Sequence, residues 1–165
     1  MGLIYKNHIG NYNQREDLLI TEMREEDIEE VLSIENRCFN SPWKRTAFEQ
    51  ELCLAWSKIL VARKSNQYHN PILGYICLWF LFNEVHILNI ATIPDFRRQG
   101  VATCLMNSCI EFSLHAGVKT LTLEVRKSNL PAISFYKKYG FEPRGVRPRY
   151  YSDNHEDAYV MWLTL

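Results

Sequence analysis

Two side chains in the last third of the sequence could exchange protons with a substrate, Glu124 and Tyr136. Glu124 lies in the run Leu-Thr-Leu-Glu-Val, whose other members favour a strand. Partial burial there would raise the pKa of Glu124 from about 4.3 towards neutrality, as a general base requires. Tyr136 follows Pro131 in a predicted helix. Its phenol has an ordinary pKa near 10 and could protonate a departing thiolate, whose pKa is near 8.5.

A basic, glycine-containing segment about 25 residues upstream of Glu124, Arg97–Ala102, could bind phosphate. It lies between a predicted strand and a predicted helix, where free backbone N–H groups stabilise an anion. Gly100 and the small Ala102 let the backbone come close to a phosphate, and arginine side chains add charge. With a base and an acid beside it, such a loop indicates group transfer from a donor that carries a pyrophosphate. Acyl transfer from coenzyme A to an amine fits this description.

Each of these features also has an ordinary structural explanation. The basic loop could be a solvated turn, Glu124 could face water by strand alternation, and Tyr136 could be a packing residue of an amphipathic helix. Asn129, just before that helix, is of a type that commonly caps helices or forms turns. The acidic segment 25–35 could attract a basic peptide, but a solvated helix face is the more common use of such residues. The ordered occurrence of loop, Glu124 and Tyr136 together favours the functional interpretation.

The composition limits the class of protein. A chain of 165 residues with 47% hydrophobic and 13% aromatic residues is one ordinary globular domain. Its 19 basic and 19 acidic residues leave no net charge, which argues against nucleic acid binding. The five cysteines form no Cys-x-x-Cys pair, and the five histidines show no metal-ligand spacing. The sequence shows no signal segment and no apolar run of about 18 residues, so we expect a cytoplasmic protein without membrane contact.

The hydrophobic periodicity predicts a single α/β domain in which helices cover a mostly antiparallel sheet. Thr21 is expected to cap the first helix, and Leu105, Cys109, Phe112 and Leu114 are candidate core residues of a later one. Residues 1–17 are polar and aperiodic and are expected to form an extension to a domain of residues 18–165. The predicted strands are 18–21, 59–62, 72–82, 85–91, 119–126, 141–146 and 157–165, and the predicted helices are 24–35, 45–54, 103–116 and 131–139.

Several segments resemble the GNAT N-acetyltransferases. Residues 89–102, Asn-Ile-Ala-Thr-Ile-Pro-Asp-Phe-Arg-Arg-Gln-Gly-Val-Ala, resemble the acetyl-CoA-binding motif of that superfamily, and residues 123–141 resemble the motif that follows it. Phe39 with Pro42-Trp43, Arg149-Tyr150-Tyr151 and Glu156-Asp157-Ala158 are similar to bacterial ribosomal-protein-alanine N-acetyltransferases. The resemblance covers about residues 18–165. Ala102 is a departure, because many members carry glycine there.

The resemblance implies a GNAT fold, an α+β arrangement with a mixed, mostly antiparallel sheet of six to seven strands and about four helices. It makes Glu124 the proton acceptor and Tyr136 the proton donor in a reaction that needs no metal. The acetyl donor would be acetyl-CoA, and Asn129 would contact it. The backbone of Ile90, Ala91 and Thr92 would bind its acetyl and pantetheine portion, and its pyrophosphate would lie on Arg98, Gln99, Gly100, Val101, Ala102 and Thr103.

The acceptor implied by the resemblance is the N-terminal α-amine of a protein, above all the N-terminal alanine of a ribosomal protein. We expect aromatic side chains of two loops to line the mouth of the site, Phe39 and Trp43 from one and Tyr150 and Tyr151 from the other. Two alternatives remain: an acetyltransferase for lysine or a small amine, and a non-catalytic acetyl-CoA-binding module. Glu124 and Tyr136 argue against the module, because binding alone requires neither.

Overall fold

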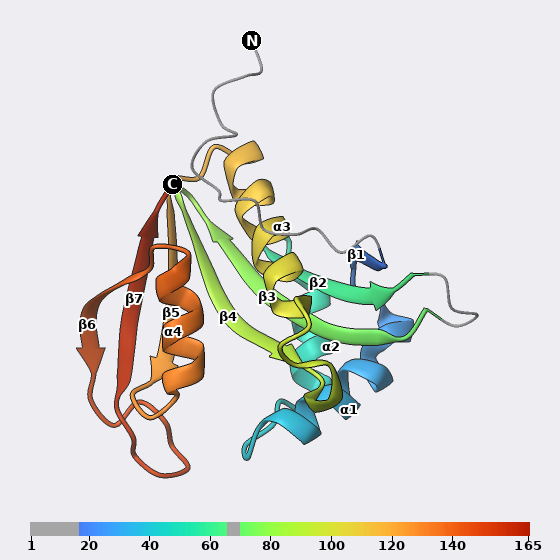
Figure 1. Cartoon of the computed structure of the whole chain (residues 1–165), viewed down its shortest axis with the longest axis horizontal. Helices are drawn as coiled ribbons and strands as arrows, with labels where there is room; N and C mark the ends of the chain where they lie inside the picture. Colours follow the sequence, from blue (N-terminus) through green and yellow to red (C-terminus); the bar gives the residue numbers. More distant parts are fainter. Residues whose placement is uncertain (1–16, 66–69) are drawn as a thin grey trace.

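A computed structural model describes residues 17–65 and 70–165 and contains one mixed sheet (Figure 1). The seven strands lie in the order β1-β2-β3-β4-β5-β7-β6. β4 and β5 pair in parallel, and all the other neighbours pair antiparallel. The strands are β1 (Leu18–Glu22), β2 (Ser57–Lys64), β3 (Ile72–Leu81), β4 (Glu84–Thr92), β5 (Thr120–Arg126), β6 (Glu142–Arg147) and β7 (Ala158–Thr164).

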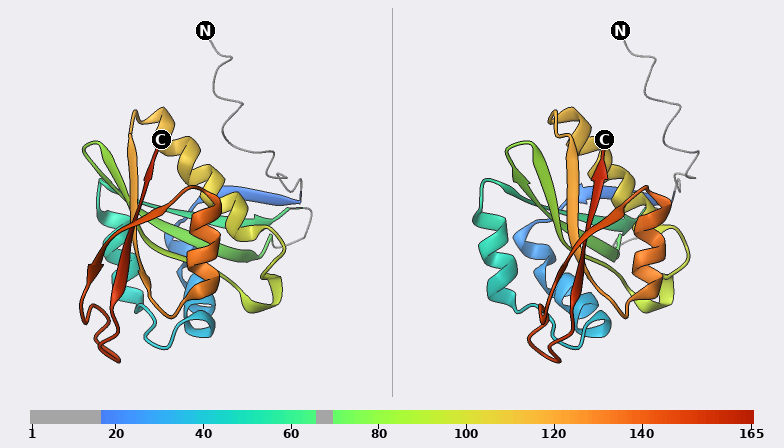
Figure 2. Two further views of the ribbon diagram at one scale, coloured as in Figure 1. Left: turned by 60° about the vertical axis from the view of Figure 1, so that its left-hand side comes forward. Right: turned by 90° about the vertical axis from the view of Figure 1, so that its left-hand side faces the viewer.

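Helices cover both faces of this sheet (Figure 2). Alternate residues of the central strands point to opposite faces and therefore build two cores. In β3, Ile76 and Leu78 pack with α3 and α4, whereas Tyr75 and Cys77 pack with α1 and α2. The helices are α1 (Ile28–Cys38), α2 (Arg45–Cys53), α3 (Val101–His115) and α4 (Leu130–Lys138), and two short 3-10 helices span Glu25–Asp27 and Pro94–Phe96.

The pairing between β4 and β5 is short. It joins Glu84–Ile87 to Thr120–Leu123 and then stops. The register between β3 and β4 shifts at this level, which leaves Leu88 as the extra residue of a β-bulge. A bulge bends its strand, and β4 and β5 separate from here to their C-terminal ends (Figure 1). Within the described residues, the side of β4 that faces β5 has no strand partner beyond Ile87.

All the predicted strands and main helices are confirmed, with small shifts of their ends. The predicted cap at Thr21 is wrong, because Thr21 lies in β1. The chain turns into the helical segment at Arg24, where the Asp27 carboxylate accepts a hydrogen bond from the Arg24 backbone N–H at 2.8 Å. The helix predicted from residue 103 begins at Val101. The predicted extension lies outside the described residues, apart from Asp17.

Two of the four predicted core residues of α3 are wrong. Leu105 and Cys109 are fully buried, but Phe112 and Leu114 are 40% and 36% exposed. The buried stripe of α3 passes through Leu105, Cys109 and Ser113, and positions 112 and 114 lie to either side of it. Phe112 is instead covered by Lys58, whose ammonium lies 5.2 Å from the centre of the ring.

Gly74 of β3 holds the separating part of β4 in place. A Cβ atom at this position would lie 2.5 Å from the Ala91 carbonyl oxygen and 3.0 Å from Cγ1 of Val101. Both neighbours belong to the segment that the sequence assigns to the acetyl donor. β3 and β4 can therefore pair at their observed separation only because residue 74 has no side chain.

We predict that Gly74→Ala lowers the free energy of unfolding by about 1–3 kcal/mol, because the added methyl overpacks the strand pair. Urea unfolding measures this change. Gly145→Ala is the matched control, since the nearest atom to a Cβ at position 145 is 3.9 Å away. Equal urea midpoints for the two variants would show that β4 tolerates the methyl without strain.

Candidate active site

Glu124 lies where β4 and β5 separate. It follows Leu123, the last residue of β5 that pairs with β4, and only 6% of its side chain is exposed. Each carboxylate oxygen contacts one basic group: Oε2 lies 2.8 Å from Nε2 of His86, and Oε1 lies 2.8 Å from Nε of Arg147. The carboxylate is therefore nearly enclosed, between a side chain of β4 and a side chain of β6.

The expected rise in the pKa of Glu124 is wrong. Burial alone would raise this pKa, but the hydrogen bond and charge of His86 and the charge of Arg147 outweigh burial and lower it. Glu124 is therefore ionised at neutral pH. It is a weaker base than the sequence suggested, and it is well suited to hold a cation.

His86 is a residue of the site that sequence reasoning missed. Its Nδ1 lies 2.8 Å from the hydroxyl of Thr122, and this hydroxyl lies 2.9 Å from the Glu84 carboxylate. A carboxylate only accepts, so Thr122 donates its one hydrogen to Glu84 and accepts from Nδ1 of His86. Nδ1 of His86 therefore carries a hydrogen, and Nε2 lies against the Glu124 carboxylate at 2.8 Å.

The sequence contained a signal for this polar chain. Glu84 and His86 occupy alternate positions of one strand, and Thr122 and Glu124 occupy alternate positions of another. Polar residues with period two in otherwise apolar strands share one face of a sheet. The register of a parallel pair, His86 opposite Thr122, was needed to see that the two sets meet.

Tyr136 lies in α4, is 6% exposed, and packs against the rings of Phe135 and Phe141. Burial raises the pKa of Tyr136 well above its usual value of 10, so the phenol stays protonated. Tyr151 interacts electrostatically with both Glu124 and Tyr136. Burial, and to a smaller extent the nearby Glu124 carboxylate, raises the pKa of Tyr151 to about 12. Tyr151 in turn contributes to the raised pKa of Tyr136. Tyr151 is thus the charge neighbour that Glu124 and Tyr136 have in common.

The basic loop before α3 has the backbone of an anion-binding turn. Arg98 and Gly100 both have positive φ, 61° and 85°, in the left-handed region. Gly100 is the N-cap of α3, and the first backbone N–H groups of a helix have no partner within it. Two side chains of the loop donate hydrogen bonds to the backbone that precedes it. Gln99 Nε2 donates to the Asp95 carbonyl at 2.9 Å, and Arg97 Nε donates to the Thr92 carbonyl at 3.4 Å. Val101, Ala102 and Thr103 form the first turn of the helix.

The predicted donor-binding residues of β4 lie on its separated part. Ile90, Ala91 and Thr92 pair with β3 on one side only. Thr92 also carries a buried hydroxyl oxygen with no hydrogen-bond partner within the described residues. Asn129 is the N-cap of α4, and its side-chain oxygen accepts from the Ala132 backbone N–H at 3.2 Å. Its capping role is therefore observed, whereas contact with an acetyl donor stays a prediction.

The four predicted substrate-binding aromatics lie in two loops. Phe39 and Trp43, in the loop between α1 and α2, are half-buried and pack against the core of that face. Tyr150 and Tyr151, between β6 and β7, lie edge to face with ring centres 5.1 Å apart. Arg126 stacks 3.8 Å from the Tyr151 ring centre, and its terminal nitrogens also pair with acidic residues of the same loop, Asp153 at 2.8 Å and Glu156 at 3.3 Å.

A buried carboxylate, Glu35, connects the first of these loops to β4 and was also missed. It is 1% exposed and accepts hydrogen bonds from the Trp43 backbone N–H at 2.9 Å and from the Tyr75 hydroxyl. The Asn89 amide of β4 lies 3.4 Å from both of its oxygens. Burial raises the pKa of Glu35 and outweighs these hydrogen bonds, which lower it.

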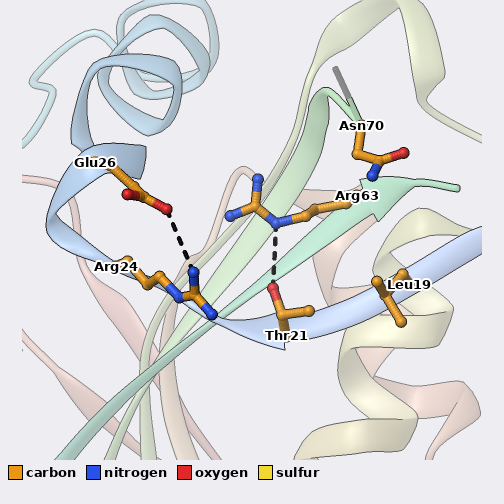
Figure 3. Close-up of a pocket in the computed structure, with 6 residues that line it drawn as sticks. All are labelled: Leu19, Thr21, Arg24, Glu26, Arg63 and Asn70. Atoms are coloured by element: carbon orange, nitrogen blue, oxygen red, sulfur yellow. Dashed lines mark hydrogen bonds and ion pairs between the residues drawn. The ribbon is translucent and has the colours of Figure 1, made fainter. Parts of the chain in front are cut away.

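A separate pocket lies near β1, and its charged side chains are paired with one another or with neighbouring residues. Its lining residues are Leu19, Thr21, Arg24, Glu26, Arg63 and Asn70 (Figure 3). Arg63 donates to Thr21 at 3.2 Å and pairs with Asp27 at 2.6 Å, and Arg24 pairs with Glu26 at 3.5 Å. Both guanidinium groups of this pocket thus already lie beside carboxylates.

Two further findings concern residues 17–65 and 70–165. No group of three or more histidine, cysteine, aspartate or glutamate side chains there is arranged to hold a metal ion. No helix in these ranges has the length and apolar character to cross a membrane.

Comparison with known proteins identifies the family to which the chain belongs. Residues 28–141 match the family described as the acetyltransferase (GNAT) family. The chain is 39% identical, over 88% of its length and 95% of the relative's, to a Bacillus subtilis protein proposed to be a ribosomal protein bS18-alanine N-acetyltransferase. The crystal structure of the ribosomal-protein-S18-alanine N-acetyltransferase from Escherichia coli superposes with a TM-score of 0.80 at 29% identity, covering 89% of this chain and 93% of that chain. Ard1 from Thermoplasma volcanium superposes with a TM-score of 0.82 at 29% identity, covering 90% and 98%.

The buried Glu35 generates a prediction about pH. Its pKa is higher in the folded than in the unfolded chain, so the folded state binds more protons between pH 4.5 and the raised folded pKa. The stabilisation is complete below pH 4.5 and is lost as the pH rises through the folded pKa. Urea unfolding from pH 4 to 8 should therefore show a fall in stability for the parent that is weaker in Glu35→Gln.

Glu29→Gln is the control for this experiment, because Glu29 lies on the same helix with a side chain that is 74% exposed. It should follow the parent's pH dependence. If Glu35→Gln also follows the parent, the folded protein does not bind a proton at Glu35 in this range.

Proposed function

The chain belongs to the acetyltransferase (GNAT) family, and we propose that it transfers the acetyl group of acetyl-CoA to the N-terminal α-amine of a protein. The leading candidate for the acceptor is the alanine N-terminus of ribosomal protein bS18, the substrate named for the Bacillus and Escherichia relatives. One observation carries the proposal: the ionised Glu124 lies where β4 and β5 separate, beside the loop that carries Tyr150 and Tyr151. An ammonium group that enters there would meet a carboxylate.

The chain's own residues fit acetyl-CoA. The one-sided edge of β4 at Ile90, Ala91 and Thr92 can pair with an extended, amide-containing arm as with an added strand. The unpartnered hydroxyl of Thr92 is a buried polar atom that a bound molecule could satisfy. The turn at Arg98–Thr103 can hold a pyrophosphate through the N–H groups at the start of α3. When bound, acetyl-CoA supplies the acetyl group as a reactive thioester.

Glu124 orients the acceptor nitrogen: the α-ammonium first loses one proton to water, and Glu124 receives the second proton when the neutral amine bonds to the acetyl carbon. A free α-amine has a pKa near 7.8, so about a tenth to a fifth of it is neutral at pH 7, whereas a lysine amine is neutral less than about 0.1% of the time. The nitrogen becomes strongly acidic as it bonds to the acetyl carbon, so a carboxylate of low pKa can accept its proton at that point. The lowered pKa of Glu124 therefore favours an α-amine over lysine as the acceptor.

Two further groups complete the proposed chemistry. A backbone N–H near Ala91 would stabilise the negative charge that develops on the acetyl oxygen. Tyr136 stays protonated because burial raises its pKa, so its phenol is available to give a proton to the departing thiolate. Asn129 would contact the donor through the side-chain amide nitrogen, since its side-chain oxygen is used in capping α4.

The two aromatic loops would select the end of a peptide. Phe39 and Trp43 are held by the core and by the buried Glu35, and Tyr151 is held by Arg126. Because these rings are already ordered in the free protein, a peptide would lose little side-chain entropy in binding between them. A mouth lined by these two loops would admit an extended N-terminus more readily than a lysine in the middle of a chain.

A competition between two peptides tests the acceptor. One begins with alanine and has no lysine, and the other has a blocked N-terminus and one internal lysine. We predict that the protein acetylates the first at a rate at least about 10²-fold above the second, since neutral lysine is about that much rarer. Mass spectrometry of the mixed products measures the ratio.

Glu124→Gln is the control, because it keeps the shape of the side chain and removes the charge. It should bind acetyl-CoA like the parent and lose about 10²-fold or more in turnover of the alanine peptide. Preferential acetylation of the blocked peptide would replace this proposal with lysine acetylation. Binding of acetyl-CoA without acetylation of any amine would leave a non-catalytic binding module.

A further inference from the structure

The two basic groups on Glu124 are held very differently. His86 contacts Oε2 and has a side chain that is 19% exposed. Its other ring nitrogen contacts the Thr122 hydroxyl, which in turn donates to Glu84. Arg147, on Oε1, has a side chain that is 57% exposed. His86 therefore belongs to the interior of the sheet, whereas Arg147 reaches the carboxylate from the solvent side.

Arg147 is the last residue of β6, an edge strand whose six residues are all exposed. Its contact with Glu124 runs through Nε, so it lacks the paired hydrogen bonds of a bidentate arginine–carboxylate contact. The guanidinium carbon also lies 5.6 Å from the centre of the Tyr150 ring. The guanidinium can leave Glu124 without losing this aromatic neighbour.

We propose that Arg147 is a tethered cation that occupies, on Oε1 of Glu124, the position taken by the α-ammonium of the substrate. This inference rests on the proposed function. Oε2 is closed by His86, so Oε1 is the oxygen that an incoming amine can reach. Binding of a peptide is then an exchange of cations, in which the α-ammonium contacts Glu124 and the guanidinium of Arg147 moves outward over Tyr150.

The exchange explains how a nearly enclosed carboxylate can be kept ionised without a substrate. The other ionisable groups around Glu124 are His86 of β4 and the phenols of Tyr150 and Tyr151. Burial raises the pKa of both phenols, so both are neutral at working pH. Arg147 supplies a positive charge at Oε1 in the free enzyme, and the substrate's ammonium supplies it in the complex. Arg147 is thus a specificity-determining residue that an uncharged ligand would not displace.

Arg147→Gln tests the exchange by steady-state kinetics with the alanine-starting peptide. Removing the competing cation should lower KM for the peptide about two- to fivefold, the range of a largely exposed ion pair, and leave KM for acetyl-CoA unchanged. Arg144→Gln is the matched control, because Arg144 lies on the same strand and pairs with Glu142 rather than with Glu124. It removes the same charge and should change neither KM.

A small cation provides a second readout that a purely structural arginine would not give. In Arg147→Gln, methylguanidinium should inhibit competitively against the peptide and raise its KM back towards the parent value. In the parent it should inhibit much less, because the tethered guanidinium already fills the position. A higher KM for the peptide in Arg147→Gln, an unchanged KM, or equal inhibition of the two proteins would overturn the inference.

Binding without turnover separates this inference from the proposed function. Alaninamide carries an α-ammonium and no carboxylate, and the carbon signal of the Glu124 carboxylate in an NMR spectrum reports its arrival. Alaninamide should shift this signal at lower concentration in Arg147→Gln than in the parent, even if neither protein acetylates a peptide. Equal titrations in an active enzyme would refute the exchange and leave the acetyltransferase proposal intact.

Discussion

The arrangement of the whole site depends on the point where β4 and β5 stop pairing. The bulge at Leu88 bends β4 away after Ile87, and β5 continues straight into its pairing with β7. This separation gives β4 a free backbone edge and brings the loop before α3 to the same end of the sheet. It also places Glu124 at the closed end of the gap between the strands, with His86 still on the paired part of β4. Gly74 maintains the spacing behind this edge.

The electrostatics of the site follow from this position. A carboxylate that is 6% exposed would be costly to ionise alone, and the basic groups of His86 and Arg147 on its two oxygens outweigh the effect of burial on its pKa. Glu35 shows the contrast on the same face of the sheet: it is 1% exposed, its neighbours are neutral hydrogen-bond donors, and its pKa is raised. The same residue type therefore serves to hold a charge in one place and to connect a loop to a strand in the other.

Much of this molecule could be predicted from sequence. Periodicity located every strand and main helix, and the order of the loop, Glu124 and Tyr136 indicated acyl transfer before the fold was known. The failures have a common cause in tertiary contacts. A burial argument gave the wrong direction for the pKa of Glu124 because His86 and Arg147 lie 38 residues before and 23 residues after it in the sequence. Phe112 and Leu114 are hydrophobic in type, but the helix presents a different stripe to the sheet.

The most direct test of this account is the titration of Glu124 itself. The carbon signal of its carboxyl group, identified by its loss in Glu124→Gln, can be followed by NMR from pH 2 to 8 in the protein without acetyl-CoA. The expected midpoint lies below 4.5, the ordinary value for glutamate, because His86 and Arg147 favour the charged form of the carboxylate. A midpoint above 4.5, towards neutrality, would show that burial dominates. It would return Glu124 to the role of a strong general base and remove the basis for the cation exchange proposed for Arg147.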